Sequence, residues 1–600
     1  MGLITSSKTR PSYDVIVVGS GAGGGQAAYT LTMEGARVLM LEAGRQYDPV
    51  TETPMFQPNF IAPLRGAATP DKPEGFYDAT VAGGWSIPGE PYTNASEDVR
   101  RQFTWWRPRM LGGRTNHWGR HALRNGPYDF KTRSRDGLGF DWPISYEDLS
   151  PYYDRVEMLI GVHGSNEGLE NTPDSPPGVL LPPPPFRVGE RLAQQRGKKL
   201  GIPVVPLRRA ILTRALDWQT IPAKLHPNNP RAQRILAQEM QARQACFWAT
   251  PCGRGCSIKA NYQSTTVHLP PALATGNLDV LPNAMVREVT VDANGKATGV
   301  VYIDKTTGQE GRVSARVVVL AAGSGETVRL LLNSKSALFP QGLANSSGRV
   351  GRYIMDTVGA ELTGQCPLLE SMPVHNEDGA GGSHAYAPWW LYGDQKAGRL
   401  DFPRGYHIEM SGGRRAPDSG TFSSLSEVAG GVFGRSLKEA ARRYYGSFMR
   451  FAGRGEMIPN EQSFCEIDPA VKDRWGIPVL RFHWQWSDHE LRQVGHMQRT
   501  FKALVEEMGG RVTGHPAYEG KAAIRQGGKI VHEVGGAIMG DDPKTSVTNA
   551  WGQTWDVKNL FIADGGPFCS NADKNPTLTL MALAWRSADW LLAEMRKGNI

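Results

Sequence analysis

The chain has 600 residues, of which 40% are hydrophobic and 21% charged, and its 67 Lys and Arg against 59 Asp and Glu give a formal net charge of +8. These fractions are typical of a globular protein, and the length indicates about two to four domains or one large two-lobed protein. The sequence has no Lys/Arg block and no basic residues interleaved with aromatic ones, so it argues against a nucleic-acid partner.

The sequence contains no obvious targeting segment. Residues 1–11 are polar, so we expect no signal peptide, and no uncharged apolar run reaches the roughly 18 residues of a membrane span. Six cysteines in a chain this long do not form a disulfide framework, and three of them cluster within 246–256. We therefore expect a cytoplasmic protein, with the clustered thiols either reduced or engaged in metal chemistry.

A nucleotide-binding fingerprint occupies the start of the chain. The apolar run 14–18 leads directly into Gly19-x-Gly21-x-x-Gly24 and an Ala-rich helix, the order of a strand that turns sharply into a helix. Gly19 permits the turn, Gly21 admits a diphosphate, and Gly24 lets helix and strand pack closely. The unpaired amides and the dipole at the helix start favour the negative charge of the diphosphate.

Glu42 completes this fingerprint. It lies 23 residues after Gly19, behind the second apolar run 37–41, and is placed to accept hydrogen bonds from a ribose. A chance Gly-rich turn is the alternative, but it leaves the ordered strand, glycines, helix, strand and acid unexplained. The fingerprint alone predicts a bound dinucleotide and leaves both NAD and FAD open.

A second glycine-containing segment follows an aperiodic stretch. Residues 47–97 are rich in Pro, Gly and aromatic residues, which is typical of a functional cover or a cofactor-wrapping loop. In 105–120, Gly112 and Gly113 stand among Arg, Asn, His and Trp, a pattern that suits backbone lying close to a flat polar ligand. An ordinary surface turn is the alternative.

Regular elements are predicted through the middle of the chain. Residues 146–160 form an amphipathic helix, and the proline-rich linker 173–185 breaks the pattern near a domain crossover. A β-hairpin is expected over 278–304, then a strand at 313–322 and a helix at 326–333. These elements return the chain to the nucleotide-binding lobe.

Residues 357–485 are expected to form a second lobe, whose strands are rich in aromatic and polar side chains. Its aromatic positions suit a surface that stacks on sugar-like rings, and a plain aromatic core is the alternative. These positions are Trp389, Trp390, Tyr392, Tyr406 and His407. Helices are predicted at 488–508 and 575–595.

Three motifs in the last part of the chain carry a family resemblance: 531–540 around His532, 559–565, and 575–579. With the fingerprint and Ala321-Ala322-Gly323, their order resembles the glucose-methanol-choline (GMC) oxidoreductases, flavoenzymes that oxidise alcohols. The resemblance covers nearly the whole chain. It implies an α/β (α+β) fold with a Rossmann-like FAD-binding lobe, 1–356 and 486–600, and a mostly antiparallel substrate lobe, 357–485.

The resemblance also implies a catalytic pair, His532 and Asn575. Alcohol oxidation needs a base for the hydroxyl proton while hydride leaves carbon for flavin N5, and a histidine titrating near neutrality suits that role. Asn575 can donate a hydrogen bond to the substrate oxygen and stabilise its developing charge. A structural histidine is the alternative for His532 taken alone.

FAD rather than NAD is implied by two further matches. Asp564 matches a contact near the ribityl and diphosphate groups, and Val286 matches the segment that meets the adenine. His117 matches a histidine joined covalently to flavin in pyranose oxidases, but its neighbour is Asn116 rather than threonine, so covalent attachment and simple packing both stay open. The residues expected to contact FAD are Gly19, Gly21, Ala22, Gly24, Glu42, Ala43, Gly112, Thr115, Asn116, His117, Val286, Asp564, Asn575 and Thr577.

The motifs at 112–120, 140–144 and 542–547 resemble those of bacterial sugar and glycoside dehydrogenases, including glycoside 3-dehydrogenase-like and gluconate dehydrogenase-like large subunits. This implies oxidation of a secondary hydroxyl of a sugar or glycoside to a ketone, with electrons passed to a cytochrome, a quinone or a small partner subunit. A pyranose oxidase-like enzyme that uses oxygen, a flavin-containing lyase and a noncatalytic flavin scaffold are the alternatives. Export with a partner subunit keeps a periplasmic location open.

Cys246, Cys252 and Cys256 are candidate iron–sulfur ligands, because some of the resembling dehydrogenases hold such a centre in this region. Three thiolates can ligate iron, but four are commoner and no fourth cysteine lies nearby. Free or paired thiols in a Gly-Arg-Gly turn are the alternative. Zinc is disfavoured because no histidine stands at finger spacing.

Overall fold

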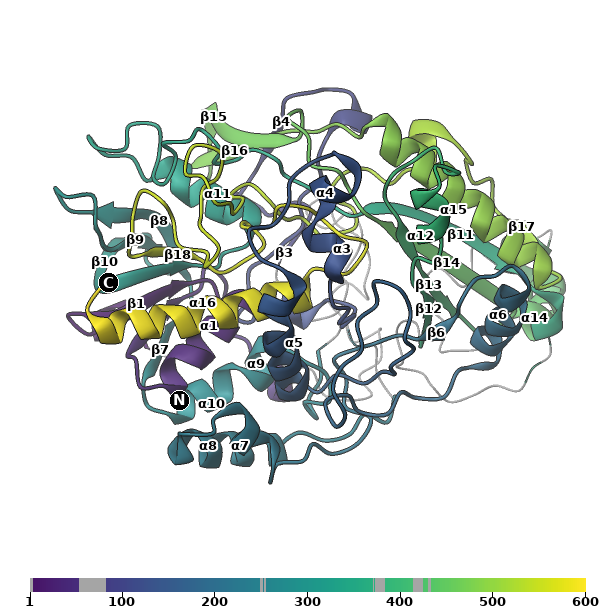
Figure 1. Ribbon diagram of the computed structural model, residues 1–600, viewed down its shortest axis with the longest axis horizontal. Helices are drawn as coiled ribbons and strands as arrows, with labels where there is room; N and C mark the ends of the chain where they lie inside the picture. The colour runs from purple at the N-terminus through teal and green to yellow at the C-terminus, as the bar shows by residue number, and fades with distance from the viewer. Residues whose placement is uncertain are drawn as a thin grey trace.

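The computed structural model describes residues 4–52, 83–248, 252, 255–370, 372, 384–413, 425–429 and 433–600. Much of the aperiodic stretch 47–97 therefore lies outside the described residues. Two sheets, each with its own covering helices, form two lobes, and both chain termini lie on the lobe that carries the fingerprint (Figure 1).

The first lobe contains a seven-stranded sheet in the order β7-β2-β1-β10-β9-β8, with β18 beside β10. Its parallel strands are β1 (Tyr13–Val18), β2 (Val38–Leu41), β7 (Leu278–Leu281), β10 (Glu310–Leu320) and β18 (Leu560–Ile562). Alternate residues of β1 enter two different core clusters, Val15 and Val17 on one face and Ile16 and Val18 on the other. Burial on both faces explains why these strands read as continuous apolar runs.

A hairpin extends this sheet. β8 (Ala284–Val291) and β9 (Ala297–Asp304) pair antiparallel, and β9 continues onto the first half of β10. The turn falls at the predicted place, with Gly295 at φ +77. Residues 278–281, expected within the hairpin, instead form β7 and pair in parallel with β2.

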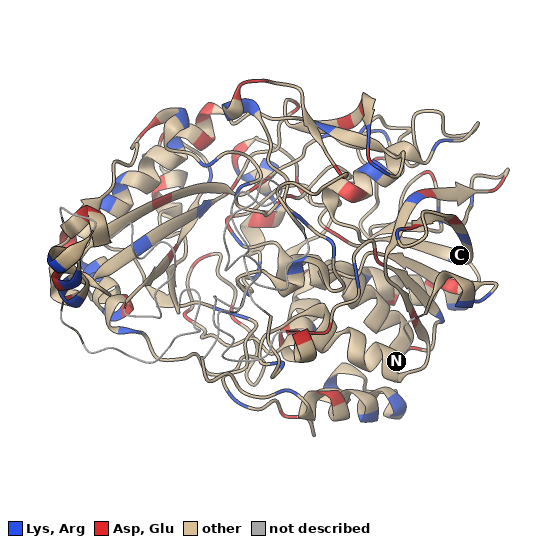
Figure 2. Cartoon of the chain, turned by 180° about the vertical axis from the view of Figure 1, so that it is seen from behind, with Lys and Arg blue, Asp and Glu red and all other residues tan. Residues whose placement is uncertain are grey.

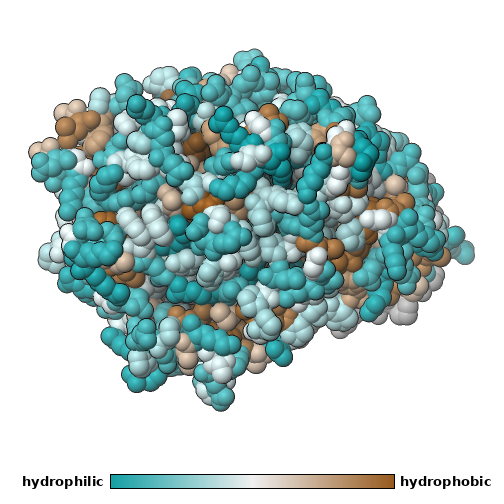
Figure 3. All heavy atoms as spheres, in the orientation of Figure 1, coloured by the Kyte–Doolittle hydropathy of each residue, from teal (hydrophilic) through white to brown (hydrophobic). Residues whose placement is uncertain are grey.

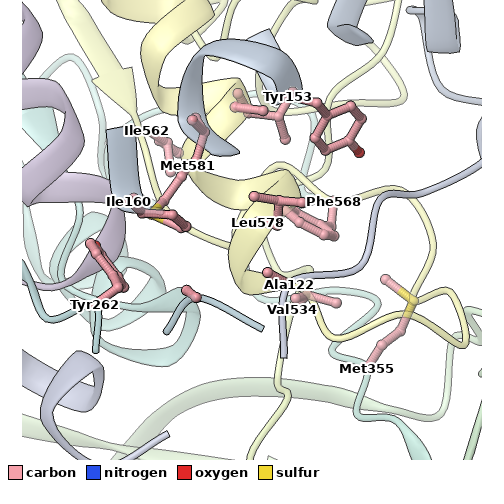
Figure 4. Close-up of a cluster of buried hydrophobic side chains, with 14 of the residues drawn as sticks. Ala122, Tyr153, Ile160, Tyr262, Met355, Val534, Ile562, Phe568, Leu578 and Met581 are labelled. Carbon is pink, nitrogen blue, oxygen red and sulfur yellow. The ribbon is translucent and has the colours of Figure 1, made fainter. Parts of the chain in front are cut away.

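Long helices cover the first sheet. α1 (Ala22–Met33) packs against α16 (Thr577–Lys597), which in turn packs against α5 (Tyr146–Ile160). α5 occupies the residues predicted for it: Ser145 caps its start by accepting a hydrogen bond from the Asp148 amide, and Gly161 ends it at φ +77. Figure 4 shows side chains of α5 and α16 meeting in the hydrophobic core.

The second lobe is an antiparallel sheet in the order β17-β11-β14-β13-β12-β6. Its strands are β6 (Val205–Pro206), β11 (Val358–Gln365), β12 (Ala385–Ala387), β13 (Tyr406–Gly412), β14 (Phe448–Gly455) and β17 (Arg511–Thr513). α15 (Asp488–Glu507) lies along one face of it (Figure 1). Gly453 of β14 faces Met497 and Phe501 of α15 so closely that it has no room for a side chain.

The chain crosses between the lobes more often than the predicted boundaries suggest. β6 comes from the region assigned to the first lobe, and α15 and β17 come from the region expected to have returned to it after 485. β6 and β17 pair with strands of the second sheet, and α15 packs on its face. The return to the first lobe therefore follows Thr513.

Short elements complete the structure. α11 (Ser324–Asn333) follows β10, and a three-stranded sheet joins β15 (Phe464–Lys472), β16 (Pro478–His483) and β4 (Thr93–Asn94). The remaining elements are η1 (Ser6–Lys8), α2 (Pro49–Glu52), β3 (Gly83–Gly84), η4 (Val99–Arg101), β5 (Arg107–Pro108), η5 (Gly113–Asn116), α3 (Pro127–Phe130), α4 (Thr132–Asp136), α6 (Val188–Lys199), α7 (Ile221–Leu225), α8 (Pro230–Gln241), α9 (Ser264–Val267), α10 (Leu269–Ala274), η7 (Pro367–Leu369), α12 (Tyr392–Lys396), α14 (Gly434–Tyr444) and η8 (Gly520–Ala522).

Basic and acidic residues are interspersed over both lobes, so neither sign dominates a lobe (Figure 2). Hydrophilic residues cover most of the face in Figure 3, with apolar residues in small groups among them. Among the helices of the described residues, none has the length and apolar character needed to cross a bilayer.

Candidate functional site

A cavity of about 850 Å³ lies between the two lobes. It extends from the glycines after β1 to His532 and Asn575, residues that are more than 500 positions away in the sequence. Its size is within the range of small-molecule and cofactor sites. The structure thus brings His532, Asn575 and most of the predicted nucleotide-binding residues together along one cavity, while Gly24, Gly112 and Asn116 lie outside its lining.

The three fingerprint glycines have distinct surroundings. Gly19 has φ +99, and a Cβ there would lie 2.4 Å from the Ala321 carbonyl oxygen. A Cβ on Gly24 would lie 1.9 Å from the Gly19 carbonyl oxygen, so helix and strand pack directly. Gly21, which caps the start of α1, has no atom within 4 Å of its Cβ position. The backbone is therefore open at the point where a diphosphate would approach the helix amides.

Glu42 follows β2 and lines the cavity. Its Oε2 accepts hydrogen bonds from the Ser20 amide at 3.1 Å and the Ser20 hydroxyl at 2.5 Å, and its Oε1 accepts from the Gly44 amide at 2.7 Å. A carboxylate has about four acceptor positions, so these three donors fix its orientation and leave capacity for a ribose hydroxyl.

The predicted adenine side of the cavity is formed by residues from two strand ends. Ala43 and Val286 both line the cavity, and the Ala284 amide at the start of β8 donates to the Glu42 carbonyl oxygen at 2.9 Å. This bond holds β8 beside the end of β2. Val286 therefore lies on the same side of the cavity as the predicted ribose contact.

The segment 112–117 closes over the fingerprint. Gly112 and Gly113 both have positive φ, and the Gly112 amide donates to the Ser20 hydroxyl at 2.8 Å. Thr115 accepts from the Ser264 amide, and Asn116 donates to the Leu111 carbonyl oxygen. Thr115 lines the cavity, whereas Asn116 is fully buried.

His117 lines the cavity at the end of this segment. Its ring lies edge-on to Trp106, with centroids 5.4 Å apart, and its Nε2 is 3.2 Å from the Met110 sulfur. These contacts place His117 beside the expected cofactor. Its covalent attachment to flavin stays a prediction.

Asp564 and Thr577 line the cavity where β18 and α16 approach it. The Asp564 carboxylate accepts from the Gly323 amide, the Thr327 hydroxyl and the Gly566 amide at 2.5–3.0 Å. Burial raises the pKa of Asp564, and these three donors oppose that rise. Through these hydrogen bonds Asp564 joins the end of β18 to the start of α11.

His532 and Asn575 face each other. His532 Nε2 lies 3.4 Å from Asn575 Nδ2, and His532 Nδ1 lies 3.0 Å from the Thr357 hydroxyl. With Asn575 Nδ2 as the donor to Nε2, the imidazole proton lies on Nδ1 and faces the Thr357 hydroxyl. Asn575 Oδ1 is buried without a hydrogen-bond partner among the described residues.

Asp356 positions the loop that carries His532. Its buried carboxylate accepts from the backbone amides of His532 at 2.9 Å, Thr357 at 2.9 Å and Ile530 at 3.3 Å. Val531, between two of these donors, has φ +64, which is strained for a β-branched residue. The carboxylate thus holds a strained loop in place directly before the imidazole.

Burial, followed by the nearby Arg454 guanidinium, lowers the pKa of His532 to about 3. This differs from the neutral-range titration expected from sequence, because desolvation disfavours the imidazolium. His532 is consequently uncharged at neutral pH, which is the form that can accept a proton.

The sequence prediction missed polar residues on the sheet of the second lobe. Glu409 of β13 and Arg454 of β14 line the cavity, together with His121 from the segment after His117. The expected stacking aromatics are instead core residues: Trp389 and Tyr406 are buried outside the cavity lining. Strand alternation in His407-Ile408-Glu409-Met410 was the available signal, because it places His407 and Glu409 on one face.

The clustered cysteines do not converge into a compact ligand set. All six cysteines are free, and among the described residues only Asp129, Glu456 and Asp573 bring three ligand atoms within 4.8 Å of one another. Burial raises the pKa of Cys246 to about 12, so without metal this thiol is protonated. An iron–sulfur centre at Cys246, Cys252 and Cys256 stays a prediction.

Comparison with known proteins gives matches over most of the chain. Family models described as GMC oxidoreductase match residues 13–357 and 459–584. A 2-methyl-1,2-propanediol dehydrogenase of Mycolicibacterium austroafricanum is 31% identical over 96% of this chain and 95% of its own. The fructose dehydrogenase large subunit of Gluconobacter japonicus is 27% identical over 98% of this chain and 99% of its own.

A solved structure shares the fold. Pyridoxine 4-oxidase from Mesorbium loti aligns with a TM-score of 0.58 over 97% of this chain and 99% of its own, at 15% identity. At this identity the likeness concerns the architecture alone. It agrees with the predicted Rossmann-like lobe joined to a second sheet.

Proposed function

Because the chain belongs to the GMC oxidoreductase family of FAD-binding flavoproteins, we propose that it oxidises a secondary hydroxyl of a sugar or glycoside to a ketone, with His532 as base. The observation that carries this proposal is the single cavity that joins the fingerprint to His532 and Asn575. The open backbone at Gly21 and the oriented carboxylate of Glu42 fit the diphosphate and ribose of FAD.

In this proposal His532 and Asn575 have different roles in the reaction. Bound FAD supplies the hydride acceptor. His532 Nε2 takes the hydroxyl proton, since its lone pair faces Asn575 and the cavity. Asn575 Nδ2 donates a hydrogen bond to the substrate oxygen, which stabilises negative charge there as the proton leaves. The alcohol thus loses one hydride and one proton and becomes a ketone.

The substrate part of the proposal draws on named relatives. Fructose dehydrogenase is named for a sugar, and 2-methyl-1,2-propanediol dehydrogenase for a small diol. Both compounds carry hydroxyls on adjacent carbons. 2-Methyl-1,2-propanediol has a primary and a tertiary hydroxyl, so only its primary carbon can lose a hydride, and the product is an aldehyde rather than a ketone. A small diol oxidised at a primary hydroxyl is therefore the second candidate substrate, and a screen should include it beside sugars and glycosides.

The electron acceptor in this proposal is a quinone, a cytochrome or a partner subunit rather than oxygen. The name of the fructose dehydrogenase large subunit supports a partner chain. An iron–sulfur centre at Cys246, Cys252 and Cys256 is a separate part of the proposal that rests on the sequence resemblance alone, because the three sulfurs do not converge among the described residues. Rates with oxygen and with an artificial quinone will distinguish a dehydrogenase from an oxidase, and the absorbance spectrum of the purified protein will reveal a cluster.

The central test is anaerobic reduction of the purified holoenzyme by sugars, glycosides and diols, followed by flavin absorbance. His532→Ala should retain FAD and lose substrate-dependent bleaching. His515→Ala is the control, since this exposed histidine lies outside the cavity lining. Normal bleaching in His532→Ala would refute its role as base. A flavin that stays oxidised with every alcohol would instead favour a lyase.

A further inference from the structure

One face of the second sheet is polar and faces the cavity. The register pairs His407 of β13 with Arg454 of β14, and Glu409 with Ala452, so these side chains share a face. The alternate residues Ile408, Met410 and Phe451 are buried in the core on the other face. Glu409 and Arg454 line the cavity. The charged side chains of these two strands therefore lie on the face that lines the cavity, where a ligand can contact them.

Two side chains from other segments contact the Glu409 carboxylate, and His407 of its own strand lies 3.4 Å from Oε1. Its Oε1 lies 2.7 Å from His121 Nδ1, and its Oε2 lies 3.2 Å from the Arg454 guanidinium. Arg454 and His121 hold the pKa of Glu409 well below its ordinary value against the opposing effect of burial, so the carboxylate is ionised. Burial lowers the pKa of His121, whose neutral ring donates from Nδ1 and keeps a lone pair on Nε2.

The strands that carry this cluster are connected to the surroundings of both predicted catalytic residues. Thr357, the hydrogen-bond partner of His532, directly precedes β11, which pairs with β14. His407 Nδ1 donates to the carbonyl oxygen of Asp573, two residues before Asn575. Glu409 and Arg454 are also close enough to alter the protonation of His532. The polar cluster therefore lies beside the reacting end of the cavity.

We propose that Glu409, Arg454 and His121 bind the hydroxyl adjacent to the one that is oxidised, so that the substrates are uncharged vicinal diols. This deepens, and rests on, the proposed function. A hydroxyl both donates and accepts, and the cluster offers carboxylate and imidazole acceptors beside a guanidinium donor. The paired charges of Glu409 and Arg454 cancel locally. A sugar acid would meet the Glu409 carboxylate and an amine would meet the Arg454 guanidinium, so the cluster disfavours both.

The test compares alcohols that differ by one hydroxyl. Holoenzyme is assayed with an artificial quinone on cis-1,2-cyclohexanediol and on cyclohexanol, each of which presents a secondary hydroxyl. We expect kcat/KM for the diol to exceed that for the mono-alcohol by about 10- to 100-fold, because the mono-alcohol lacks the second hydroxyl that would hydrogen-bond to the cluster. In Glu409→Gln the ratio should fall towards one. D-gluconate should be a poorer substrate than D-fructose.

The chain provides a matched control. Glu466 of β15 also accepts from an arginine, Arg481, and a histidine, His483, but none of these three residues lines the cavity. Glu466→Gln should keep the wild-type preference for the diol. Equal rates with both alcohols in the wild type, or an unchanged ratio in Glu409→Gln, would overturn the proposal.

Calorimetry separates this proposal from the proposed function. Holoenzyme should bind cis-1,2-cyclohexanediol more tightly than cyclohexanol, and Glu409→Gln should lose that difference. If no alcohol reduces the flavin, the proposed oxidation fails, while diol binding that depends on Glu409 would still support the subsite. Diol binding that does not depend on Glu409 would refute it. If Glu409→Gln does not fold, Arg454→Lys takes its place. This variant keeps the positive charge but loses the guanidinium fork, and it should likewise lose the tighter binding of the diol.

Discussion

His532 Nδ1 lies 3.0 Å from the hydroxyl of Thr357, the residue directly before β11 of the second sheet. On its other side, His532 Nε2 lies 3.4 Å from Asn575, directly before the Pro576 cap of α16 in the first lobe. The imidazole therefore joins the two lobes, and each partner sets the role of one ring nitrogen. The ring is oriented by elements that are remote from each other in sequence.

Removing the Thr357 hydroxyl should impair proton transfer. Thr357→Val leaves Nδ1–H without its acceptor, so we expect kcat to fall about 10- to 100-fold with KM nearly unchanged, the loss of one buried hydrogen bond. Thr357→Ser keeps a hydroxyl and should retain most activity. Steady-state kinetics on both variants measure this, and equal kcat values for Val and Ser would contradict the role of the hydroxyl.

The activity should lack an acidic limb near pH 6.5. His532 accepts a proton only when it is neutral, and burial lowers its pKa to about 3, so the neutral form is present throughout pH 5–8. We expect the contribution of His532 to kcat/KM to be flat across that range. A pH–rate profile measured on stable holoenzyme checks this. An acidic limb with a midpoint near 6.5 in the wild type would contradict this expectation.

Asp356→Asn should disturb the loop before His532. In the variant an NH2 group replaces one carboxylate oxygen and faces backbone N–H groups, so at least one hydrogen bond is lost. We expect the free energy of unfolding to fall by about 1–3 kcal/mol and kcat to fall as well. Denaturant unfolding and steady-state kinetics measure the two effects. Asp292→Asn, in the exposed turn between β8 and β9, is the control and should leave both values near wild type.

Two fingerprint glycines should respond differently to alanine. In Gly24→Ala the new methyl meets the Gly19 carbonyl oxygen, and we expect a loss of about 3 kcal/mol or more in stability. Gly21→Ala meets no protein atom, so the chain should fold but contain less FAD because the methyl occupies the approach of the diphosphate. Flavin absorbance per chain and thermal unfolding separate these effects. Full FAD content in Gly21→Ala would contradict the predicted diphosphate position.

Glu326 should contribute to stability that is lost in acid. Burial opposes its ionisation, but Arg109 and Arg329 outweigh this and lower its pKa to about 2. A lowered carboxyl pKa stabilises the fold above the unfolded-state pKa of about 4.3, and this contribution disappears as the pH falls towards 2. At neutral pH the ionised Glu326 carboxylate contributes about 3 kcal/mol to the free energy of unfolding.

The corresponding variant is Glu326→Gln. It should be less stable than wild type at pH 7, and the difference should shrink between pH 4.3 and 2 as wild-type Glu326 becomes protonated. Urea unfolding across this range measures it. Glu519→Gln, at an exposed carboxylate, should differ little from wild type at any pH. If the difference in unfolding free energy between Glu326→Gln and wild type stayed constant from pH 7 to pH 2, the charge of Glu326 would not be responsible for it.

The locally encoded features could be predicted from sequence. The turn at Gly19, the capped helix at Tyr146–Ile160 and the turn at Gly295 depend on a few neighbouring residues, and each occurs where it was expected. The paired arrangement of His532 and Asn575 was reached through motif resemblance. The position of each partner around His532, by contrast, depends on pairings across hundreds of residues, such as Met355 with Val534.

Residues of the second sheet were harder to predict, because the physical role of a side chain depends on which face it occupies. Tyr406 and His407 are neighbours, but Tyr406 is packed in the core near α15, hydrogen-bonded to His496 and Thr500, and His407 contacts Glu409. Composition indicated aromatic stacking, while the period of two along β13 separates the apolar side from the charged one. Without the register of β13 and β14, the pairing of Glu409 with Arg454 could not be inferred.

The alternation along β13 and β14 gives the protein two independently adjustable surfaces. Glu409 and Arg454 line the cavity and can be exchanged without altering Ile408, Met410 or Phe451, which carry the packing of the sheet. The fingerprint has no such freedom, since a methyl at Gly19 or Gly24 collides with backbone. New substrate preferences are therefore best engineered by replacing alternate residues on a few strands, with the cofactor-binding residues left untouched.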